Sequence, residues 1–298
     1  MKHTCPNPEC ASARIKKAGT YYRTSDHQTV QRFRCCACSR NFSEATGTPE
    51  FGQNKRQLNQ PIMCMLASSS SQNRLALNLG TNRKTIARKL AFLGAECARK
   101  NRLHNEAHAP AKYVQFDEME TFEHTKCKPL SIALAVEDKV RRIIGVQVSL
   151  MPCKGPLAEV SRKKYGHRTD ERRQGLESLF QDMAPLCSKK LHLLSDKCPR
   201  YMPIVQKFFK KRPEFKVNYA QTKGARGCST AQGELKKLEK DPLWSLNHTC
   251  AMFRAWVNRL FRRTWNTTKK VENLVHHLQI YAYYHNTVLL KEPIGEAV

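Results

Sequence analysis

This chain has few acidic residues and no long apolar run. Its 298 residues include 25 Asp and Glu against 52 Lys and Arg, which gives a formal net charge of +27. Such a shortage of acids indicates a polyanionic partner, and nucleic acid is the commonest one. No stretch of about eighteen apolar residues occurs, so we expect no membrane span and no membrane partner.

The first residues also lack the apolar core of a secretory signal. We therefore expect a cytoplasmic protein that is associated with the nucleoid through its DNA. In the cytosol, 13 cysteines do not suggest a disulfide framework, and the clustered ones indicate metal binding instead. The length allows one medium-sized domain and one or two small ones.

Four cysteines form two close pairs near the N-terminus. They are Cys5, Cys10, Cys35 and Cys38, and turn-bounded, alternating segments separate the pairs. Two pairs of thiolates suit tetrahedral zinc, which would stabilise a segment too short to build its own core. Residues 1–50 are thus predicted to be a zinc ribbon. Ordinary buried or free cysteines are the alternative, and Cys36 is a poorly spaced competing ligand.

Residues 55–100 show a helical pattern with a break at Gly80. A second helix is expected to start with Thr81 as its N-cap and to turn Ile86, Leu90 and Leu93 inward. Its basic side chains Arg83, Lys84, Arg88 and Lys89 would remain outside, as on a recognition helix in a major groove. The pattern predicts an all-α helix-turn-helix. A basic amphipathic helix with a solvated charged face is the alternative.

Residues 112–290 alternate between strand-like and helix-like segments. Strands are expected at 113–117, 129–137, 142–149, 190–195 and 215–219, and helices at about 170–184, 201–211 and from 246 onward. Three strands in a meander, followed by alternating helices and strands, predict a mixed α/β sheet. The small zinc ribbon and the helix-turn-helix would precede this core.

Two aspartates each close an apolar run of this core. Asp117 would end the first strand and Asp196 follows the fourth. In a ribonuclease H-like fold these strands are neighbours, so the two carboxylates would bind two metal ions that act on a phosphodiester. Glu118 would point away from Asp117, because side chains alternate along a strand.

Such a site needs a third ligand, and the residue pattern alone does not choose one. The candidates are Glu234, Glu239, Asp241, Asn247 and Glu272.

The chain resembles the DDE-type transposases of bacterial insertion sequences, nearest the founding insertion-sequence family and its relatives with a third-position Asn. The resemblance spans nearly the whole chain and rests on Phe33-Arg-Cys-Cys-Ala-Cys-Ser-Arg-Asn-Phe42, Thr46-Gly-Thr-Pro49, the two aspartates, and Asn247 to Arg254 followed by Arg259-Leu-Phe-Arg-Arg-Thr-Trp265 and Thr268-Lys-Lys270. In the family a catalytic Glu precedes a similar Arg by seven residues. The matching position here is Asn247, whose amide carries no charge.

The resemblance implies an enzyme that binds the terminal repeats of a mobile element and cuts and joins double-stranded DNA. It implies Asp117, Asp196 and Asn247 as catalytic magnesium ligands beside the structural zinc of the ribbon. Contacts to DNA are expected from Arg83, Lys84, Arg88, Arg254, Arg259 and Arg263. Because two DNA ends must be paired, a homo-oligomer is expected.

Two other functions fit the same residues. One is a DNA-binding protein that has lost catalysis, and the other is a metal-dependent nuclease that cuts without joining. A purely structural zinc protein would leave Asp117 and Asp196 without a role.

Overall fold

The computed structural model describes residues 3–24, 27–223, 241–261 and 264–290. The chain divides into two compact units, residues 1–62 and 63–298. Among the described residues, none of the helices combines the length and the apolar character needed to cross a membrane. The division into a zinc ribbon (1–50), a helix-turn-helix (55–100) and a catalytic domain (112–290) stays a prediction.

The first unit contains a small antiparallel sheet. Its strands are β1 (Ile15–Arg23), β2 (Gln28–Cys35) and β3 (Asn41–Ser43), in the order β1-β2-β3. Phe33 of β2 is paired in register with Phe42 of β3, and both side chains are buried. A core this small cannot stabilise a unit of about sixty residues by itself, so the unit depends on a further source of stability.

The second unit is built on a mixed five-stranded sheet in the order β6-β5-β4-β7-β8. The strands are β4 (Ala111–Phe122), β5 (Pro129–Glu137), β6 (Ile143–Leu150), β7 (Cys187–Ser195) and β8 (Lys216–Gln221). β5 runs antiparallel to both of its neighbours, β4 and β6, whereas β4, β7 and β8 run parallel. The predicted mixed α/β sheet is therefore present, with strands close to their expected places.

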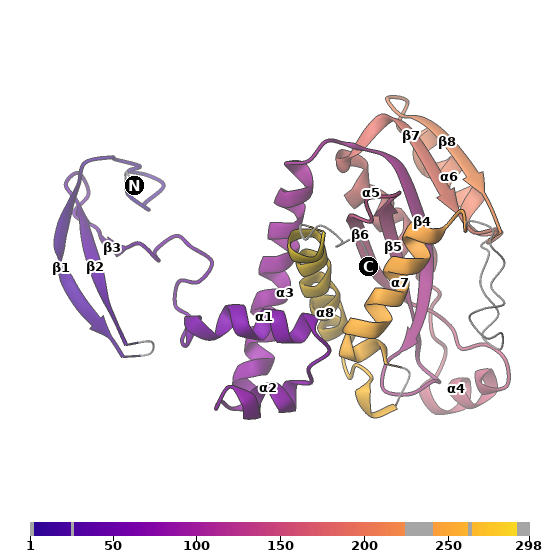
Figure 1. Ribbon diagram of the computed structural model, residues 1–298, viewed down its shortest axis with the longest axis horizontal. Helices are drawn as coiled ribbons and strands as arrows, with labels where there is room; N and C mark the ends of the chain where they lie inside the picture. Colours follow the sequence, from indigo (N-terminus) through magenta and orange to yellow (C-terminus); the bar gives the residue numbers. More distant parts are fainter. Residues whose placement is uncertain (1–2, 25–26, 224–240, 262–263, 291–298) are drawn as a thin grey trace, which may run out of the picture. The chain divides into compact units, whose positions relative to one another are not determined.

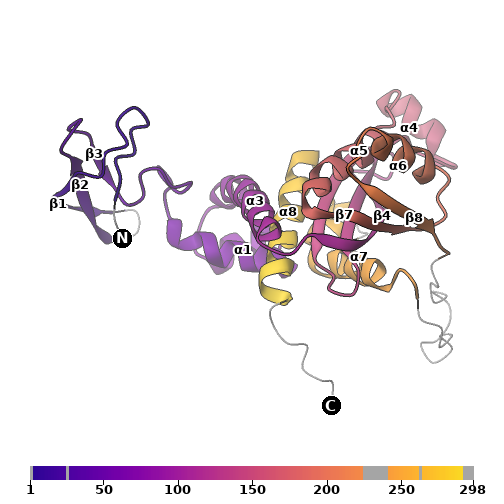
Figure 2. The same cartoon turned by 90° about the horizontal axis from the view of Figure 1, so that it is seen from above.

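Helices cover both faces of this sheet (Figures 1 and 2). α5 (Arg172–Met183) and α6 (Tyr201–Lys210) bury Phe180 and Phe208 against Phe116 and its neighbours on one face. α7 (Trp244–Trp256) packs against β4 and β5 on the other face. α4 (Leu157–Tyr165) lies between β6 and α5 in the chain, and it was not expected from the sequence.

The helical part that precedes the sheet is α1 (Asn59–Ala67), α2 (Gln72–Asn78) and α3 (Arg83–Glu106). α3 lies side by side with α8 (Val271–Tyr284) in both views. The two helices approach closely at Gly94, where a Cβ atom would come within 2.4 Å of the His276 side chain. Short turns of 3-10 helix lie at Arg56–Leu58, Ala184–Leu186, Asn258–Leu260 and Thr264–Asn266, and a π-helical turn at His285–Leu289 follows α8.

Candidate functional sites

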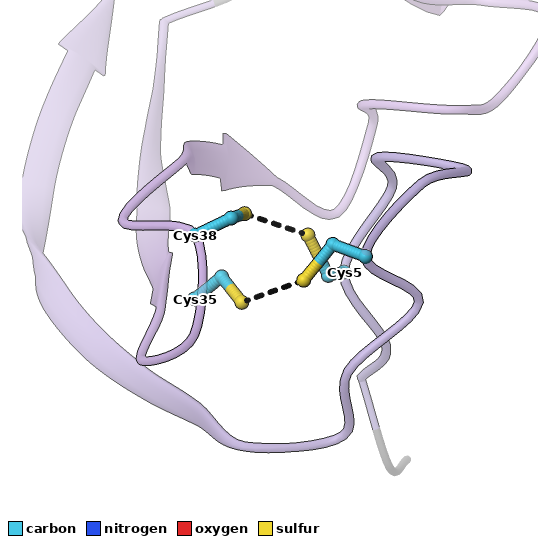
Figure 3. A group of neighbouring side chains, drawn as sticks. Cys5, Cys35 and Cys38 are labelled. Carbon is cyan, nitrogen blue, oxygen red and sulfur yellow. Dashed lines mark hydrogen bonds between the residues drawn. The ribbon is translucent and has the colours of Figure 1, made fainter.

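The four predicted zinc cysteines lie together. Their sulfur atoms are all within 4.8 Å of one another, with 3.5 Å between Cys5 and Cys38 and 3.7 Å between Cys10 and Cys35. Figure 3 shows the sulfur atoms of Cys5, Cys35 and Cys38 turned inward. Zinc–sulfur bonds of about 2.3 Å in a tetrahedron would place the sulfurs about 3.8 Å apart. The cluster therefore fits zinc. Cys36 is exposed and outside the cluster.

The local backbone prepares one of these thiols for metal binding. Backbone N–H groups of Cys38 and Ala37 lower the pKa of Cys35 to about 6, against the effect of burial. The backbone at Asn7 lowers the pKa of Cys5, but burial and the neighbouring thiols raise it to about 12 overall. Four adjacent thiolates repel one another, so a bound dication is what would keep all four ionised.

Asp117 lies within its strand and does not end it. The expected strand stopped at residue 117, but β4 continues to Phe122 because its antiparallel pairing with β5 runs on to that residue. The parallel pairing with β7 ends earlier, at Phe116 opposite Ser195. Asp117 is therefore the first residue of β4 beyond the parallel part of the sheet, which is where open α/β sheets bind ligands.

Asp196 directly follows β7, as expected. Because Phe116 is paired with Ser195, the next residue on each parallel strand is an aspartate. Both carboxylates also act on one buried phenol: burial raises the pKa of Tyr201, and the charges of Asp117, Glu118 and Asp196 raise it further. The two aspartates therefore lie near the same hydroxyl group.

Asp117 leaves β4 on the same face as Gln115, because side chains two residues apart on a strand share a face. Gln115 accepts a hydrogen bond from the backbone N–H of Leu246 at 3.0 Å and donates one to the carbonyl of Pro242 at 2.9 Å, so this is the face that α7 covers. The Oδ1 atom of Asp117 nevertheless accepts a hydrogen bond from Tyr201 of α6 at 3.0 Å, so the carboxylate turns back toward the α6 side.

Asn247 follows Leu246 in α7, and Leu246 is fully buried. On the other side of Asn247 in the sequence, His248 contacts the guanidinium of Arg141 in the β5–β6 turn at 2.9 Å. α7 packs against β4, the strand of Asp117, and against β5. The place of Asn247 beside Asp117 and Asp196 stays a prediction.

Glu118 was predicted to point away from Asp117, but the hydroxyl of Tyr201 contacts both carboxylates. The carboxylate of Glu118 accepts hydrogen bonds from Arg200, from Ser131 at 2.7 Å and from Tyr201 at 3.3 Å. Glu118 is thus fully engaged on the α6 side.

Tyr201 and Arg200 were missed as site residues. Tyr201 is 2% exposed and donates its hydroxyl hydrogen to Asp117 at 3.0 Å as well as to Glu118. A usable signal was present, because the start of a helix soon after Asp196 brings its first side chains to the same sheet edge.

The other candidates for a third ligand are placed differently. Asp241 lies next to Asn247 and accepts a hydrogen bond from its amide. Glu272 is exposed in the first turn of α8. Glu234 and Glu239 lie outside the described residues.

α2 and α3 form a helix pair joined at Gly80, whose φ of +54° suits the turn. The N-cap of α3 is Asn82 and not the expected Thr81, because the Asn82 side chain accepts from the N–H of Lys84 at 2.7 Å. Ile86, Leu90 and Leu93 are buried as predicted.

The predicted DNA contacts differ in exposure. Arg83, Lys84, Arg88 and Arg254 are exposed. Lys89 was expected outside but is only 6% exposed. The pKa of Arg259 is lowered by burial and by the charge of Arg83, so these two arginines lie near each other. Arg263 lies outside the described residues.

Comparisons with known proteins give little further information. The sequence matches no protein-family model and no curated protein. Among solved structures, the catalytic domain of the Mos1 mariner transposase matches 68% of this chain and 94% of its own length, with 10% identity and a TM-score of 0.26. A likeness at this TM-score supports no conclusion about activity or substrates.

Proposed function

We propose that this protein is a DDE-type transposase of the insertion-sequence kind. It binds the terminal repeats of its element, hydrolyses the phosphodiester at each end, and directs the freed 3′-hydroxyl to attack target DNA. The observation that carries the proposal is the pairing of Phe116 with Ser195, which brings Asp117 and Asp196 to the same level on neighbouring parallel strands. The first and fourth strands of the core are neighbours, as a ribonuclease H-like core requires.

In this proposal Asp117 and Asp196 bind two magnesium ions, and Asn247 adds a neutral oxygen ligand from α7. Carboxylate and amide oxygens are the ligands that magnesium prefers. The ions held by these residues would supply Lewis acidity at the phosphodiester and an activated nucleophile, so no protein general base would be needed.

DNA binding would come from three parts of the chain. Zinc held by the four-cysteine cluster stabilises the N-terminal ribbon, and α3 offers Arg83, Lys84 and Arg88 as the recognition helix of a helix-turn-helix. The exposed Arg254 adds a phosphate contact near Asn247. Contacts of lysine and arginine with phosphates release counterions, so binding should weaken steeply with salt. The pairing of two ends makes a homo-oligomer the expected working form.

One observation favours a second candidate, a DNA-binding protein without catalysis. The residue at the position of the family's third carboxylate is a neutral amide, and that amide is hydrogen-bonded to Asp241. Such a protein would bind the element ends and leave them uncut.

A strand-transfer assay separates these candidates. Purified protein, zinc-loaded, is incubated with magnesium, DNA carrying the element ends and a target plasmid. The proposal predicts cuts that leave 3′-hydroxyls at the ends and joined products in the plasmid. Binding of the ends without cuts would identify the non-catalytic protein, and cuts without joined products would identify a nuclease.

A further inference from the structure

The amide of Asn247 is held by a carboxylate. Its Nδ2 atom donates a hydrogen bond to Oδ2 of Asp241 at 2.7 Å. The two residues are six positions apart in the sequence, and Asp241 precedes the first residue of α7. Asn247 carries no charge of its own, but the negative charge of Asp241 lies one hydrogen bond away from its amide.

Asp241 is itself fixed at the start of the helix. Its Oδ1 atom accepts a hydrogen bond from the N–H of Leu243 at 3.0 Å, and its carbonyl accepts one from Trp244 at 3.1 Å. The backbone N–H of Asn247 donates to the carbonyl of Leu243 at 2.8 Å. Both carboxylate oxygens are therefore engaged within the first turns, and the amide of Asn247 is oriented from a rigid point.

This orientation determines which end of the amide is left for a cation. Because Nδ2 donates to Asp241, the carbonyl oxygen Oδ1 is turned away from that carboxylate. A carboxylate that accepts from an amide also polarises it and increases the negative charge on its oxygen. Carboxylates behind metal-bound histidines act in the same way, by fixing the ligand and strengthening it as a donor.

We propose that Asp241 is a positioning residue that supplies, through Asn247, the charge that the third metal ligand lacks. The inference rests on the proposed function, because it assumes that Asn247 faces the metal ions of Asp117 and Asp196. The pair of Asn247 and Asp241 does together what a single glutamate does in the resembling family.

The test measures metal binding and not only cleavage. Zinc-loaded full-length protein is titrated with Mn²⁺, and free Mn²⁺ is followed by electron paramagnetic resonance. Asp241→Asn should weaken binding about tenfold, as removal of such supporting carboxylates does elsewhere. Asparagine also has an Oδ1 acceptor for the N–H of Leu243, so the variant keeps that hydrogen bond ahead of α7. An unchanged thermal midpoint would verify that the helix is intact.

Two double variants test whether Asp241 acts through Asn247. Combining Asp241→Asn with Asn247→Ala should weaken binding no more than Asn247→Ala alone, because residues that act as a unit are not additive. Combining Asp241→Asn with Asn247→Asp exchanges the amide and the carboxylate, and it should restore wild-type affinity or exceed it. Additive losses, or no recovery in the exchanged variant, would overturn the proposal and leave Asp241 as a direct ligand or only as the acceptor for Leu243.

Asp196→Asn separates this inference from the proposed function. If Mn²⁺ binding depends on Asp196 but is unchanged in Asp241→Asn, the inference alone is wrong. If no Mn²⁺ site depends on Asp196, the inference and the proposed function are both wrong.

Discussion

Replacement of Tyr201 by phenylalanine tests how the carboxylate of Asp117 is held in place. The hydroxyl of Tyr201 donates to Asp117 at 3.0 Å and lies 3.3 Å from Glu118, so one hydrogen is shared by two carboxylates. The ring packs against Phe116 with 5.2 Å between centroids, and phenylalanine would keep that contact. The variant therefore removes one oxygen atom and leaves the core otherwise filled.

The size of the effect follows from the charge of the acceptors. Hydrogen bonds to charged groups contribute about 1.5–3 kcal/mol, whereas neutral ones contribute about 0.5–1.5 kcal/mol. Tyr219→Phe is the matched control, because the hydroxyl of Tyr219 bonds to that of Ser195 at 2.7 Å and not to a carboxylate. We expect Tyr201→Phe to lower the free energy of unfolding by about 2 kcal/mol and the control by about 1 kcal/mol.

Urea unfolding followed by far-ultraviolet circular dichroism measures both variants. Tyr201→Phe should also raise the magnesium concentration needed for half-maximal nicking, because Asp117 loses the group that orients it, and Tyr219→Phe should not. Equal stability losses in the two variants, with the same magnesium requirement, would refute the reasoning.

Three further predictions concern other parts of the chain. Cys38→Ser should lower the zinc content of the protein, measured by atomic absorption, and unfold the ribbon, because three thiolates hold the metal less tightly than four. Burial lowers the pKa of His277 to about 3, from an ordinary value of 6.5. The neutral form is therefore favoured by folding, and up to about 5 kcal/mol of stability is present above pH 6.5 and lost as the pH falls toward 3. His277→Gln should make the pH dependence of the free energy of unfolding shallower, and an unchanged slope would contradict this. Gly94→Ala should lower the free energy of unfolding in urea by about 1–3 kcal/mol, because the new methyl group would collide with His276 between α3 and α8. An unchanged free energy of unfolding would mean that α3 and α8 can move apart at this point without cost.

Much of the core could be predicted because its strands are apolar and bounded by turns. The segment 129–137 is a strand with the same limits in the structure, and α6 differs from its expected range by one residue. β4 was predicted too short, because its apolar run stops at Phe116 while the following polar residues are paired only through the hairpin with β5.

α4 could not be predicted for a related reason. Its apolar residues Leu157 and Val160 are exposed while Ser161 is buried, so the apolar pattern of the segment does not indicate its buried face.

The candidate site was predictable only in part. Asp117 and Asp196 could be recognised because each follows an apolar run, and the parallel register brings them level. The hydrogen bond of Tyr201 to Asp117 and that of Asn247 to Asp241 depend on how helices enter the sheet edge, which no local pattern encodes. The burial of Lys89 could not be predicted either, because a basic residue on a helix can still be covered by neighbouring elements.

The central claim is that Asp117 and Asp196 form a metal-dependent DNA-cleaving site. The most direct measurement is magnesium-dependent nicking of DNA that carries the element ends, comparing the wild-type protein with Asp196→Asn. Asp182→Asn is the control, because Asp182 of α5 accepts a hydrogen bond from Gln147 of β6 and is not one of the proposed metal ligands. The account predicts nicking at the ends by the wild type and the control, and none by Asp196→Asn. Nicking that survives in Asp196→Asn would contradict the account.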